Sequence, residues 1–294
     1  MRSNNSRQSK PFAERRRRRA IIGTIAGVLA VASWLFSLSR LSFISALAIE
    51  DVEVYGVEAD LAPVMRSAAL EAMSGAYLGI FSKGNAFTYP EARIVAWVAS
   101  SSPRVMNVSV RRSGLHKLVV SVSEKATAAI ICADLPDLSD GSLDRNENCY
   151  EADATGYVFK PVGGSPSADL FRYYIPDLAG KKLDGSFATS TEKFRTIFEL
   201  LSSVKEAGIG VHGILLENGH DYELYADNPA GGSLVVITMN EDAGLEVQKE
   251  NLIAYWNRMV ALAKTKSVNL AWDEIKLQYP PNVYSRPDFG LESK

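Results

Sequence analysis

Residues 15–39 read RRRRRAIIGTIAGVLAVASWLFSLS, which is five arginines followed by twenty residues without a charge. At about 1.5 Å of rise per residue, twenty helical residues span the roughly 30 Å hydrocarbon core of a bilayer. Gly23 and Gly27 are tolerated in membrane helices, and Trp34 suits the outer membrane interface. This stretch therefore predicts one transmembrane helix over residues 20–40.

The charge of the 294-residue chain is unevenly distributed. Residues 1–19 contain eight basic side chains and one acidic one, a net charge of +7, so the other 275 residues carry −9 because the whole chain carries −2. By the positive-inside rule, this basic tail predicts a cytoplasmic N-terminus and an extracytoplasmic body. No folded nucleic-acid reader accompanies the arginines, so we expect no nucleic-acid partner. We interpret five residues as the topology signal: Arg15, Arg16, Arg17, Arg18 and Arg19.

A cleaved signal peptide is the main alternative to an uncleaved anchor, since a basic segment precedes an apolar one in both. The apolar stretch is longer than the usual core of a signal peptide. The nearest approach to a cleavage site is the small-residue sequence Ser45-Ala46-Leu47-Ala48. We therefore expect an uncleaved anchor, followed by a short connector over residues 41–48.

The two cysteines, Cys132 and Cys149, lie 17 positions apart and flank a polar, acidic loop. In an oxidising compartment such a pair can form a disulfide, whereas in a reducing one both thiols stay free. Neither cysteine has the spacing of a metal ligand or a histidine beside it. The sequence leaves the disulfide and the two free thiols as equal alternatives.

The first 80 residues of the body predict a small α+β unit over residues 49–127. Alternating apolar residues indicate strands, and the i, i+3, i+4, i+7 spacing indicates helices. With turns at Gly56, Gly75 and Gly114, the predicted order is strand 49–54, helix 60–74, helix 90–102, strand 105–112 and strand 117–124. We expect both helices on one face of the sheet.

The remaining body predicts a mixed β domain with two helices over residues 128–285, followed by a tail over 286–294. A capping box at Thr189 to Glu192 predicts the start of the first helix. The predicted elements are two strands within 150–162, a helix to 207, strands 214–216, 222–226 and 234–238, a helix over 245–264 and a strand over 273–279.

No motif for chemistry is visible. His116, His212 and His220 lie in no metal-binding frame, and the sequence contains no nucleophile elbow, phosphate-binding loop or dinucleotide fingerprint. We therefore predict a noncatalytic protein without a cofactor. An extracytoplasmic enzyme held by its signal anchor remains an alternative.

The acidic loop between the cysteines suggests one metal-site hypothesis. Its acidic residues crowd into fourteen positions, and Asp140-Gly141 with Glu147 matches half of a calcium-binding EF-hand loop. The first and third ligand positions would be Pro136 and Leu138, which offer no side-chain oxygen. A solvated acidic loop is therefore the favoured interpretation of Asp134, Asp137, Asp140, Asp144 and Glu147.

Four stretches together resemble a known family. They are Ile49 to Gly56 (V-x-V-x-G), Pro103 to Arg112 with Leu118 to Glu124, the turn D-x-x-G-x-V-F at Asp153 to Phe159, and Ile275 to Pro280 with Val283-Tyr284. In this order, behind one anchor, they resemble the FtsQ/DivIB family of bacterial cell-division proteins. Members of that family combine a basic tail, one transmembrane helix, a POTRA domain and a β domain.

The chain departs from the family pattern at three places. Ala126-Thr127 stand where the family has a proline after the last POTRA strand, and Lys276 and Gln278 replace an aspartate and an arginine in the terminal strand. The acidic loop between the cysteines is an insertion.

The resemblance implies a scaffold in the cytoplasmic membrane at the division septum. Its expected partners are membrane-anchored division proteins that form a coiled coil, FtsL–FtsB or DivIC-like. The terminal strand would pair with a strand of the partner by β-augmentation. The implied partner-binding residues are Asp273, Glu274, Ile275, Lys276, Leu277, Gln278, Tyr279, Val283 and Tyr284.

This expectation makes Asp273 to Tyr279 the exposed edge of the sheet, and Pro280-Pro281 would limit its extension. Replacement of Leu277 by Lys would then weaken partner capture without unfolding the body. The alternative is an interior strand followed by a tail. Another POTRA-bearing envelope assembly protein is a further alternative for function, although such proteins usually carry a barrel or several POTRA repeats.

Overall fold

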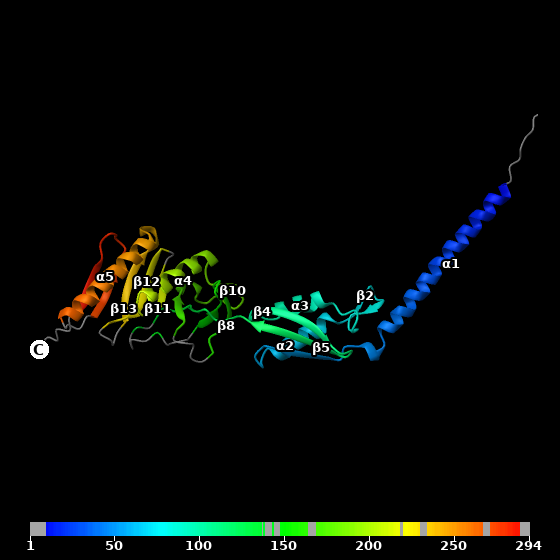
Figure 1. Ribbon diagram of the computed structural model, residues 1–294, viewed down its shortest axis with the longest axis horizontal. Helices are drawn as coiled ribbons and strands as arrows, with labels where there is room; N and C mark the ends of the chain where they lie inside the picture. The colour runs from blue at the N-terminus through cyan, green and yellow to red at the C-terminus, as the bar shows by residue number, and fades with distance from the viewer. Residues whose placement is uncertain are drawn as a thin grey trace, which may run out of the picture. The chain divides into compact units, whose positions relative to one another are not determined.

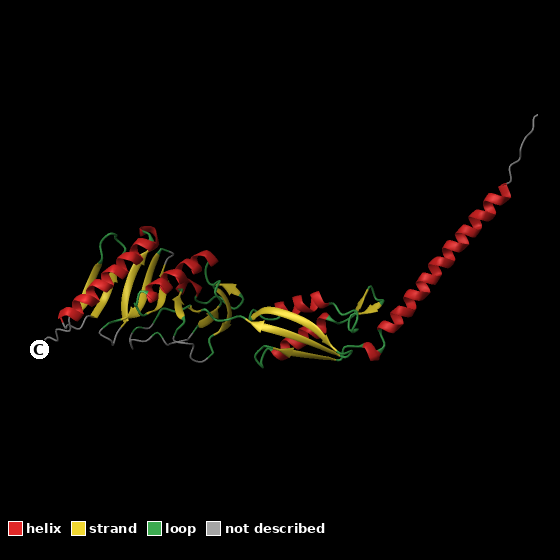
Figure 2. Ribbon diagram, viewed as in Figure 1, coloured by secondary structure: helices red, strands yellow, loops and turns green. Residues whose placement is uncertain are grey.

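The computed structural model is a mixed α/β protein with five α-helices among the residues that it describes (Figures 1 and 2). It describes residues 10–136, 138, 143, 148–163, 169–217, 220–229, 234–266 and 271–288. The chain divides into unit 1, Met1–Glu124, and unit 2, Lys125–Lys294. The sequence placed this boundary three residues later, after Thr127.

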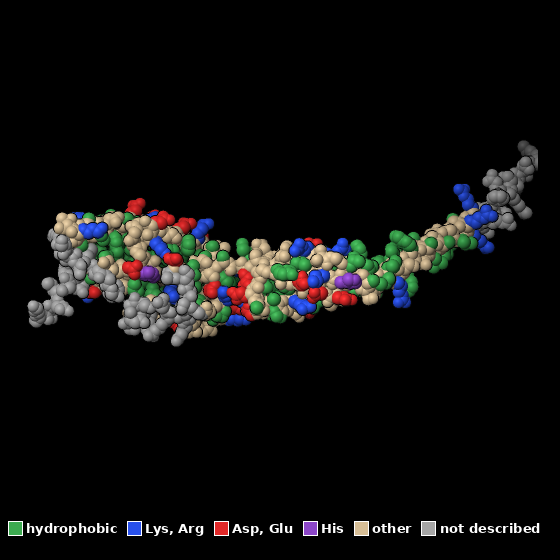
Figure 3. Space-filling model, turned by 60° about the horizontal axis from the view of Figure 1, so that its bottom comes forward, with side chains coloured by type: hydrophobic (Ala, Val, Ile, Leu, Met, Phe, Trp, Pro, Cys, Tyr) green, Lys and Arg blue, Asp and Glu red, His purple; other side chains and the backbone are tan. Residues whose placement is uncertain are grey.

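Helix α1, Lys10–Ser42, is longer than the predicted span of 20–40 at both ends. Arginine is a good helix former, so the helix continues through the basic run. Within it, Arg16–Ser42 is long and apolar enough to cross a membrane: its most apolar 18 residues have a mean hydropathy of 2.1, and none of them is buried. In Figure 3, hydrophobic side chains cover much of this helix and basic side chains gather at its first turns.

Unit 1 contains the predicted order of strand, helix, helix, strand and strand. These elements are β1 (Asp51–Tyr55), α2 (Ala62–Ala72), α3 (Glu91–Ser100), β4 (Val105–Ser113) and β5 (Lys117–Glu124). The sheet order is β1-β5-β4, with β1 parallel and β4 antiparallel to β5. A hairpin of β2 (Ala76–Tyr77) and β3 (Phe81–Ser82), together with a 3-10 turn at Ser45–Leu47, was not predicted.

Both helices of unit 1 pack on the same face of its sheet. One buried cluster joins the helices to the strands through Val52, Met65, Ala69, Ile94, Val98, Leu118, Val120 and Val122. Strand β5 places every second side chain, Leu118, Val120 and Val122, in this cluster, which is the period of a half-buried strand. The predicted placement of both helices on one face is confirmed.

The described residues of unit 2 form a ten-stranded sheet of order β10-β8-β7-β6-β9-β11-β12-β13-β14-β15. Its strands are β6 (Ala129–Cys132), β7 (Cys149–Ala152), β8 (Tyr157–Pro161), β9 (Phe171–Tyr174), β10 (Ser186–Phe187), β11 (Val211–Glu217), β12 (Asp221–Asp227), β13 (Leu234–Asn240), β14 (Ala271–Lys276) and β15 (Tyr284–Asp288). The predicted two helices are α4, Thr191–Glu206, and α5, Leu245–Lys266.

Helix α4 begins at a capped end, but its N-cap is one residue later than the predicted box requires, so Glu192 is not at the third helical position that completes a capping box. Ser190 is the N-cap, and its Oγ accepts a hydrogen bond of 3.2 Å from the backbone N–H of Lys193. The helix then buries Phe194, Ile197 and Leu201 against the sheet. The apolar periodicity of this segment therefore determines both its position and its buried face.

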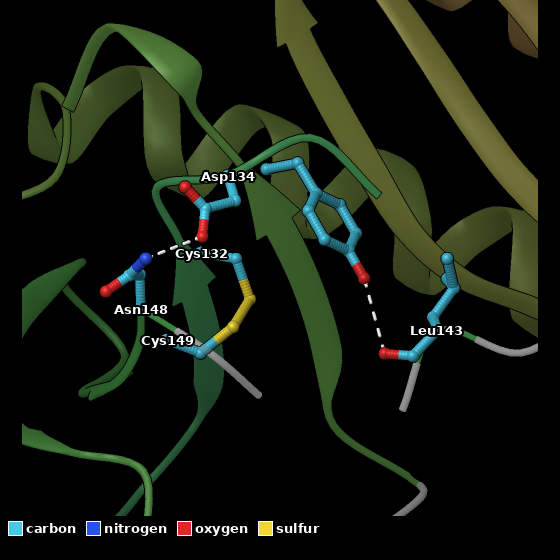
Figure 4. Close-up of a disulfide and its surroundings, with 6 residues drawn as sticks. Cys132, Asp134, Leu143, Asn148 and Cys149 are labelled. Atoms are coloured by element: carbon cyan, nitrogen blue, oxygen red, sulfur yellow. Dashed lines mark hydrogen bonds between the residues drawn. A yellow bond between two sulfur atoms is a disulfide. The ribbon is translucent and has the colours of Figure 1, made fainter. Parts of the chain in front are cut away.

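The opposite face of the sheet has a smaller apolar cluster of its own. It contains Ile130, Cys132, Leu143, Cys149, Tyr174, Leu215 and Tyr225. The Tyr174 hydroxyl donates a 3.4 Å hydrogen bond to the carbonyl oxygen of Leu143 (Figure 4). The segment between the two cysteines thus contributes Leu143 to this second cluster.

Candidate functional site

Strand β14 lies inside the sheet of unit 2. It pairs in parallel with β13, where Ile237 lies opposite Ile275, and antiparallel with β15, where Ser285 lies opposite Ile275. The prediction that Asp273 to Tyr279 forms the exposed edge is therefore wrong. The edge is β15, part of which the sequence analysis assigned to a tail.

Helix α5 explains why β14 lies beside β13, and the pairing with β15 on the other side makes β14 an interior strand. The chain leaves β13, crosses one face of the sheet as α5 and returns as the parallel strand β14, which is the geometry of a βαβ crossover. The rings of Trp256 in α5 and Trp272 in β14 lie 4.6 Å apart between centroids. This contact buries β14 beneath the helix.

The burial of Leu277 follows from the same packing. Its side chain is 1% exposed, and its backbone N–H donates a 2.9 Å hydrogen bond to the carbonyl oxygen of Thr238. A lysine at this position would place a charge in the core, where its desolvation is unfavourable. The burial of Leu277 contradicts the exposed position that the sequence predicted, and we now expect lysine at position 277 to destabilise unit 2.

The side chains of β14 and β15 divide between two faces. On the face toward α5, the hydroxyl groups of Tyr255 and Ser285 share a hydrogen bond. On the opposite face the cross-strand pairs are Glu274 with Arg286 and Lys276 with Tyr284. Because side chains alternate along a strand, the residues of the second face lie away from the helix.

Polar and aromatic side chains dominate this second face near the edge. Lys276 Nζ lies 2.9 Å from a carboxylate oxygen of Glu274, an ion pair at partly exposed positions. The rings of Tyr279 and Tyr284 meet edge to face with centroids 6.4 Å apart, and both side chains are more than half exposed. These two tyrosines provide accessible apolar area beside the edge strand.

The nine predicted partner-binding residues are thus separated by the fold. Ile275 and Leu277 belong to the core, and Val283 packs against it. Gln278 Nε2 donates a 3.3 Å hydrogen bond to Asp221 Oδ1 inside the unit. The exposed members are Asp273, Lys276, Tyr279 and Tyr284, with Glu274 partly exposed.

Within the described residues, the outer side of strand β15 pairs with no other strand. Pro287 lies within this strand and Arg286 is exposed on it, and both residue types restrict indiscriminate pairing at a sheet edge. The edge can therefore accept one additional strand of limited length.

The other edge of the same sheet is less suited to this role. Strand β10 contains two residues, Ser186–Phe187, and pairs with β8 through both. A partner strand gains affinity from each backbone hydrogen bond that it forms, so a two-residue edge offers little. We therefore place the candidate interaction site at β15, and we define the edge surface as Glu274, Lys276, Tyr279, Tyr284 and Arg286.

The predicted topology signal lies at the start of α1. The side chains of Arg16, Arg17, Arg18 and Arg19 are exposed there, whereas that of Arg15 lies outside the described residues. Exposed arginines next to an apolar helix are the arrangement that the positive-inside rule concerns.

Cys132 and Cys149 form a disulfide in the structure, at directly opposed positions of β6 and β7 (Figure 4). At the base of the acidic loop, Asn148 Nδ2 donates a 2.7 Å hydrogen bond to Asp134. The other parts of the calcium hypothesis, Asp137, Asp140, Gly141, Asp144 and Glu147, lie outside the described residues.

Sequence reasoning missed the role of Arg104. Its side chain is 10% exposed, and its guanidinium donates hydrogen bonds to Glu124 at 2.7 and 3.0 Å and to Asp60 at 2.9 Å. Burial opposes its charge, yet hydrogen bonds to Glu58 and Glu124 raise the pKa of Arg104 above its usual value. The buried arginine therefore joins the start of β4 to the end of β5.

The D-x-x-G turn at Asp153 has a clear physical basis. Asp153 Oδ1 accepts hydrogen bonds from the backbone N–H of Thr155 at 2.9 Å and of Tyr157 at 3.3 Å. Gly156 has a φ of +79°, and a Cβ there would lie 2.8 Å from the Phe194 ring. Both the aspartate and the glycine are therefore required by the turn.

Within the described part of the chain, no group of three or more His, Cys, Asp or Glu side chains could hold a metal ion. The histidines are dispersed: His212 Nε2 lies 2.7 Å from Asp227, His220 lies 3.3 Å from Asp242, and His116 Nδ1 lies 3.0 Å from the carbonyl oxygen of Ala48.

No protein-family model matches the chain, and no curated protein shows significant sequence similarity to it.

Proposed function

We propose that this chain is a noncatalytic, membrane-anchored scaffold of the bacterial cell-division machinery, of the FtsQ/DivIB type. In this proposal α1 crosses the cytoplasmic membrane with its arginines in the cytoplasm. Residues 49–127 act as a POTRA domain and residues 128–285 as the β domain, both outside the cytoplasm. The proposed location is the division septum.

The observation that best supports this proposal is the order of parts along one chain. An apolar helix preceded by arginines is followed by a unit of strand, helix, helix, strand and strand, and then by a mixed sheet. That sheet ends in the accessible strand β15, beside exposed tyrosines. An anchor, a small α+β unit and an open sheet edge suit a protein that holds other proteins at the membrane.

Partner capture at the edge surface would proceed by β-augmentation. A strand of a membrane-anchored coiled-coil partner adds beside β15 and forms backbone hydrogen bonds with it. The exposed rings of Tyr279 and Tyr284 supply apolar contact, and Glu274, Lys276 and Arg286 supply charge selectivity. This mode of recognition requires neither a metal nor a catalytic group.

Localisation of the protein in living cells tests this proposal. A fluorescent protein fused to the cytoplasmic N-terminus should form a band at midcell in dividing cells, and depletion of the chain should give filamentous cells. A signal-anchored enzyme or a general envelope assembly factor predicts a uniform peripheral signal. Uniform signal in dividing cells, with normal division after depletion, would overturn the scaffold proposal.

A further inference from the structure

The last turn of α1 is bonded to the β2–β3 hairpin of unit 1. Ser39 Oγ donates a 2.5 Å hydrogen bond to the carbonyl oxygen of Ile80, and Ser42 Oγ accepts one of 2.7 Å from the N–H of Ser82. The buried Asn85 donates through Nδ2 to the carbonyl oxygen of Ser42 at 3.0 Å. The hairpin is therefore held against the C-terminal end of the apolar helix.

The length of α1 sets the level of this hairpin relative to a bilayer. The 27 residues of Arg16–Ser42 extend for about 40 Å as a helix, which exceeds the roughly 30 Å hydrocarbon core. With the arginines at one surface, the turn that contains Ser39 and Ser42 lies in the interfacial layer at the other. The hairpin bonded to that turn lies at the same level.

The hairpin presents large apolar side chains to its surroundings. Leu78 at its tip is 96% exposed, and Phe87, just beyond the hairpin, is 65% exposed. The neighbouring exposed or partly exposed residues are Leu41, Phe43, Ile44, Tyr77 and Ile80. An apolar patch of this kind in a soluble unit marks an interaction site.

The backbone conformation at the tip of the hairpin makes leucine unfavourable at position 78 when the turn is in water. Leu78 has a φ of +50° and Gly79 a φ of +72°, and the N–H of Ile80 donates a 2.8 Å hydrogen bond to the carbonyl oxygen of Tyr77. Turns of this kind favour Asn or Gly, because a bulky side chain is strained at positive φ. The structure thus holds a leucine outward where a small polar residue would be more stable in water.

Cations accompany the aromatic residues of this patch. Lys83 Nζ lies 5.5 Å from the ring centroid of Tyr77, and the Arg112 guanidinium lies 4.9 Å from that of Phe87. Glu91 lines the cleft beside Lys83, together with Arg93, so the surroundings stay basic. Aromatic rings with nearby Lys and Arg are the composition that favours a membrane interface with anionic headgroups.

We propose that the membrane patch, defined as residues 76–82 with Phe43 and Phe87, inserts into the outer interface of the bilayer that α1 spans. Leu78 and Phe87 enter the upper acyl region, while Lys83 and Arg112 meet lipid phosphates. The patch fixes unit 1 at the membrane surface through a second contact besides the helix. This inference rests on the membrane-spanning part of the proposed function and is independent of partner binding.

Depth-dependent fluorescence quenching tests this contact on the full chain. Both native cysteines form the disulfide, so a new cysteine provides a single labelling site for an environment-sensitive dye. Leu78→Cys and Phe87→Cys report on the patch, and Leu29→Cys reports on the helix centre. Met106→Cys is the matched control, because it is 63% exposed near the end of the sheet where Val105 pairs with Glu124, away from the Ser113–Lys117 end.

Each variant is reconstituted without any partner protein in vesicles of phosphatidylethanolamine and phosphatidylglycerol that carry nitroxide-labelled lipids. We expect strong quenching at positions 78 and 87 by lipids with the nitroxide near the headgroup, and emission at position 106 that resembles the dye in water. Position 29 should respond most to lipids with a deep nitroxide.

Two results would overturn the inference, and they differ in meaning. In the first, the dye is quenched at position 29 but no more at positions 78 and 87 than at position 106. This result supports insertion of α1 and contradicts insertion of the membrane patch. A protein partner would then be the better candidate to cover the patch. No quenching at position 29 shows that α1 is not inserted, which contradicts the anchoring part of the proposed function as well.

Discussion

The hydroxyl groups of Tyr255 in α5 and Ser285 in β15 share a hydrogen bond that connects the last strand of the sheet to its longest covering helix. The bond points Ser285 toward the helix. Because neighbouring side chains of a strand alternate, Tyr284 and Arg286 point away from α5. The hydrogen bond between Tyr255 and Ser285, on the face toward α5, therefore helps to fix the position of the edge surface on the opposite face.

Replacement of Tyr284 by Ala should weaken partner binding without changing stability. The ring is 53% exposed and supplies apolar area at the proposed interface, so its loss should raise the Kd by about tenfold or more, which corresponds to roughly 1.4 kcal/mol. Titration of the reconstituted full chain with the proposed coiled-coil partner measures this. The matched control is Phe187→Ala, which is equally exposed at the opposite edge of the sheet. An equal loss of partner affinity in both variants would argue against β15 as the partner-binding edge.

Replacement of Leu277 by Lys should unfold or strongly destabilise unit 2. The side chain is 1% exposed, and the loss of its packing together with a buried charge should lower the free energy of unfolding by at least about 3 kcal/mol. Tyr279→Lys, two residues further along at a 64% exposed position, should change it by less than about 0.5 kcal/mol. Thermal unfolding of both variants measures the difference. Equal melting temperatures would contradict the burial of β14.

Replacement of Gly156 by Ala should lower the free energy of unfolding by more than the strain of a positive φ alone would. The new Cβ would lie 2.8 Å from the buried Phe194 ring, so we expect the free energy of unfolding to fall by about 2 to 4 kcal/mol. Gly180 has a similar φ of +73° with no atom within 4 Å of such a Cβ, so Gly180→Ala should cost only about 1 kcal/mol. Denaturant unfolding of the two variants separates contact from conformation. A larger loss at position 180 would be inconsistent with this packing.

The stability of unit 2 should fall when Asp153 is protonated. Burial opposes the charge of Asp153, but the hydrogen bonds from Lys125, at 2.5 Å, and from Thr155 lower the pKa of Asp153 below its usual value. A carboxyl group with a lower pKa in the folded state stabilises the fold above its unfolded pKa. That contribution is lost as the pH falls below roughly 4 and through the folded pKa.

Asp153→Asn lacks this titration, so its stability deficit relative to the native chain should shrink between pH 7 and pH 3. Urea unfolding at the two pH values measures the deficit. Glu199→Gln, at an exposed position of α4, is the control and should show a small deficit that changes little with pH. A deficit of Asp153→Asn that is constant with pH would show that the carboxylate charge does not contribute.

Periodicity was sufficient to predict the elements whose side chains enter a core. In α2, for example, Met65, Ala69 and Ala72 are buried at the helical spacing that the sequence showed. The same holds for the apolar face of α4 and for Leu118, Val120 and Val122 of β5, although Val119 between them is buried as well. In each case the buried face repeats with the period of the element, which is the information that one sequence contains.

The edge of the sheet could not be predicted because β15 has little apolar signal. Its residues Tyr284 to Asp288 include Pro287 and three polar side chains, and the residue that bonds to the helix, Ser285, is itself polar. The position of β15 depends on pairing with β14, and β14 lies beside β13 because α5 crosses from β13. Such long-range pairing leaves no periodic trace in the sequence.

The contacts of Arg104 and of the membrane patch escaped prediction for a related reason. Arg104 meets Asp60 and Glu124 across 44 and 20 positions of sequence, and Ser39 meets Ile80 across 41. The two-residue strands β2 and β3 are too short for an alternating pattern. A leucine at the tip of a turn becomes informative only once its exposure is known.

The most direct test of partner capture at β15 is site-specific photo-cross-linking in dividing cells. A photoreactive phenylalanine analogue replaces Arg286 on the edge surface, Phe187 at the opposite edge or Met106 in unit 1. We predict that position 286 alone cross-links to a single-pass, coiled-coil division protein. The same adduct from position 187, or no adduct from position 286 while the fusion still localises to the septum, would contradict the assignment of β15 as the partner-binding edge.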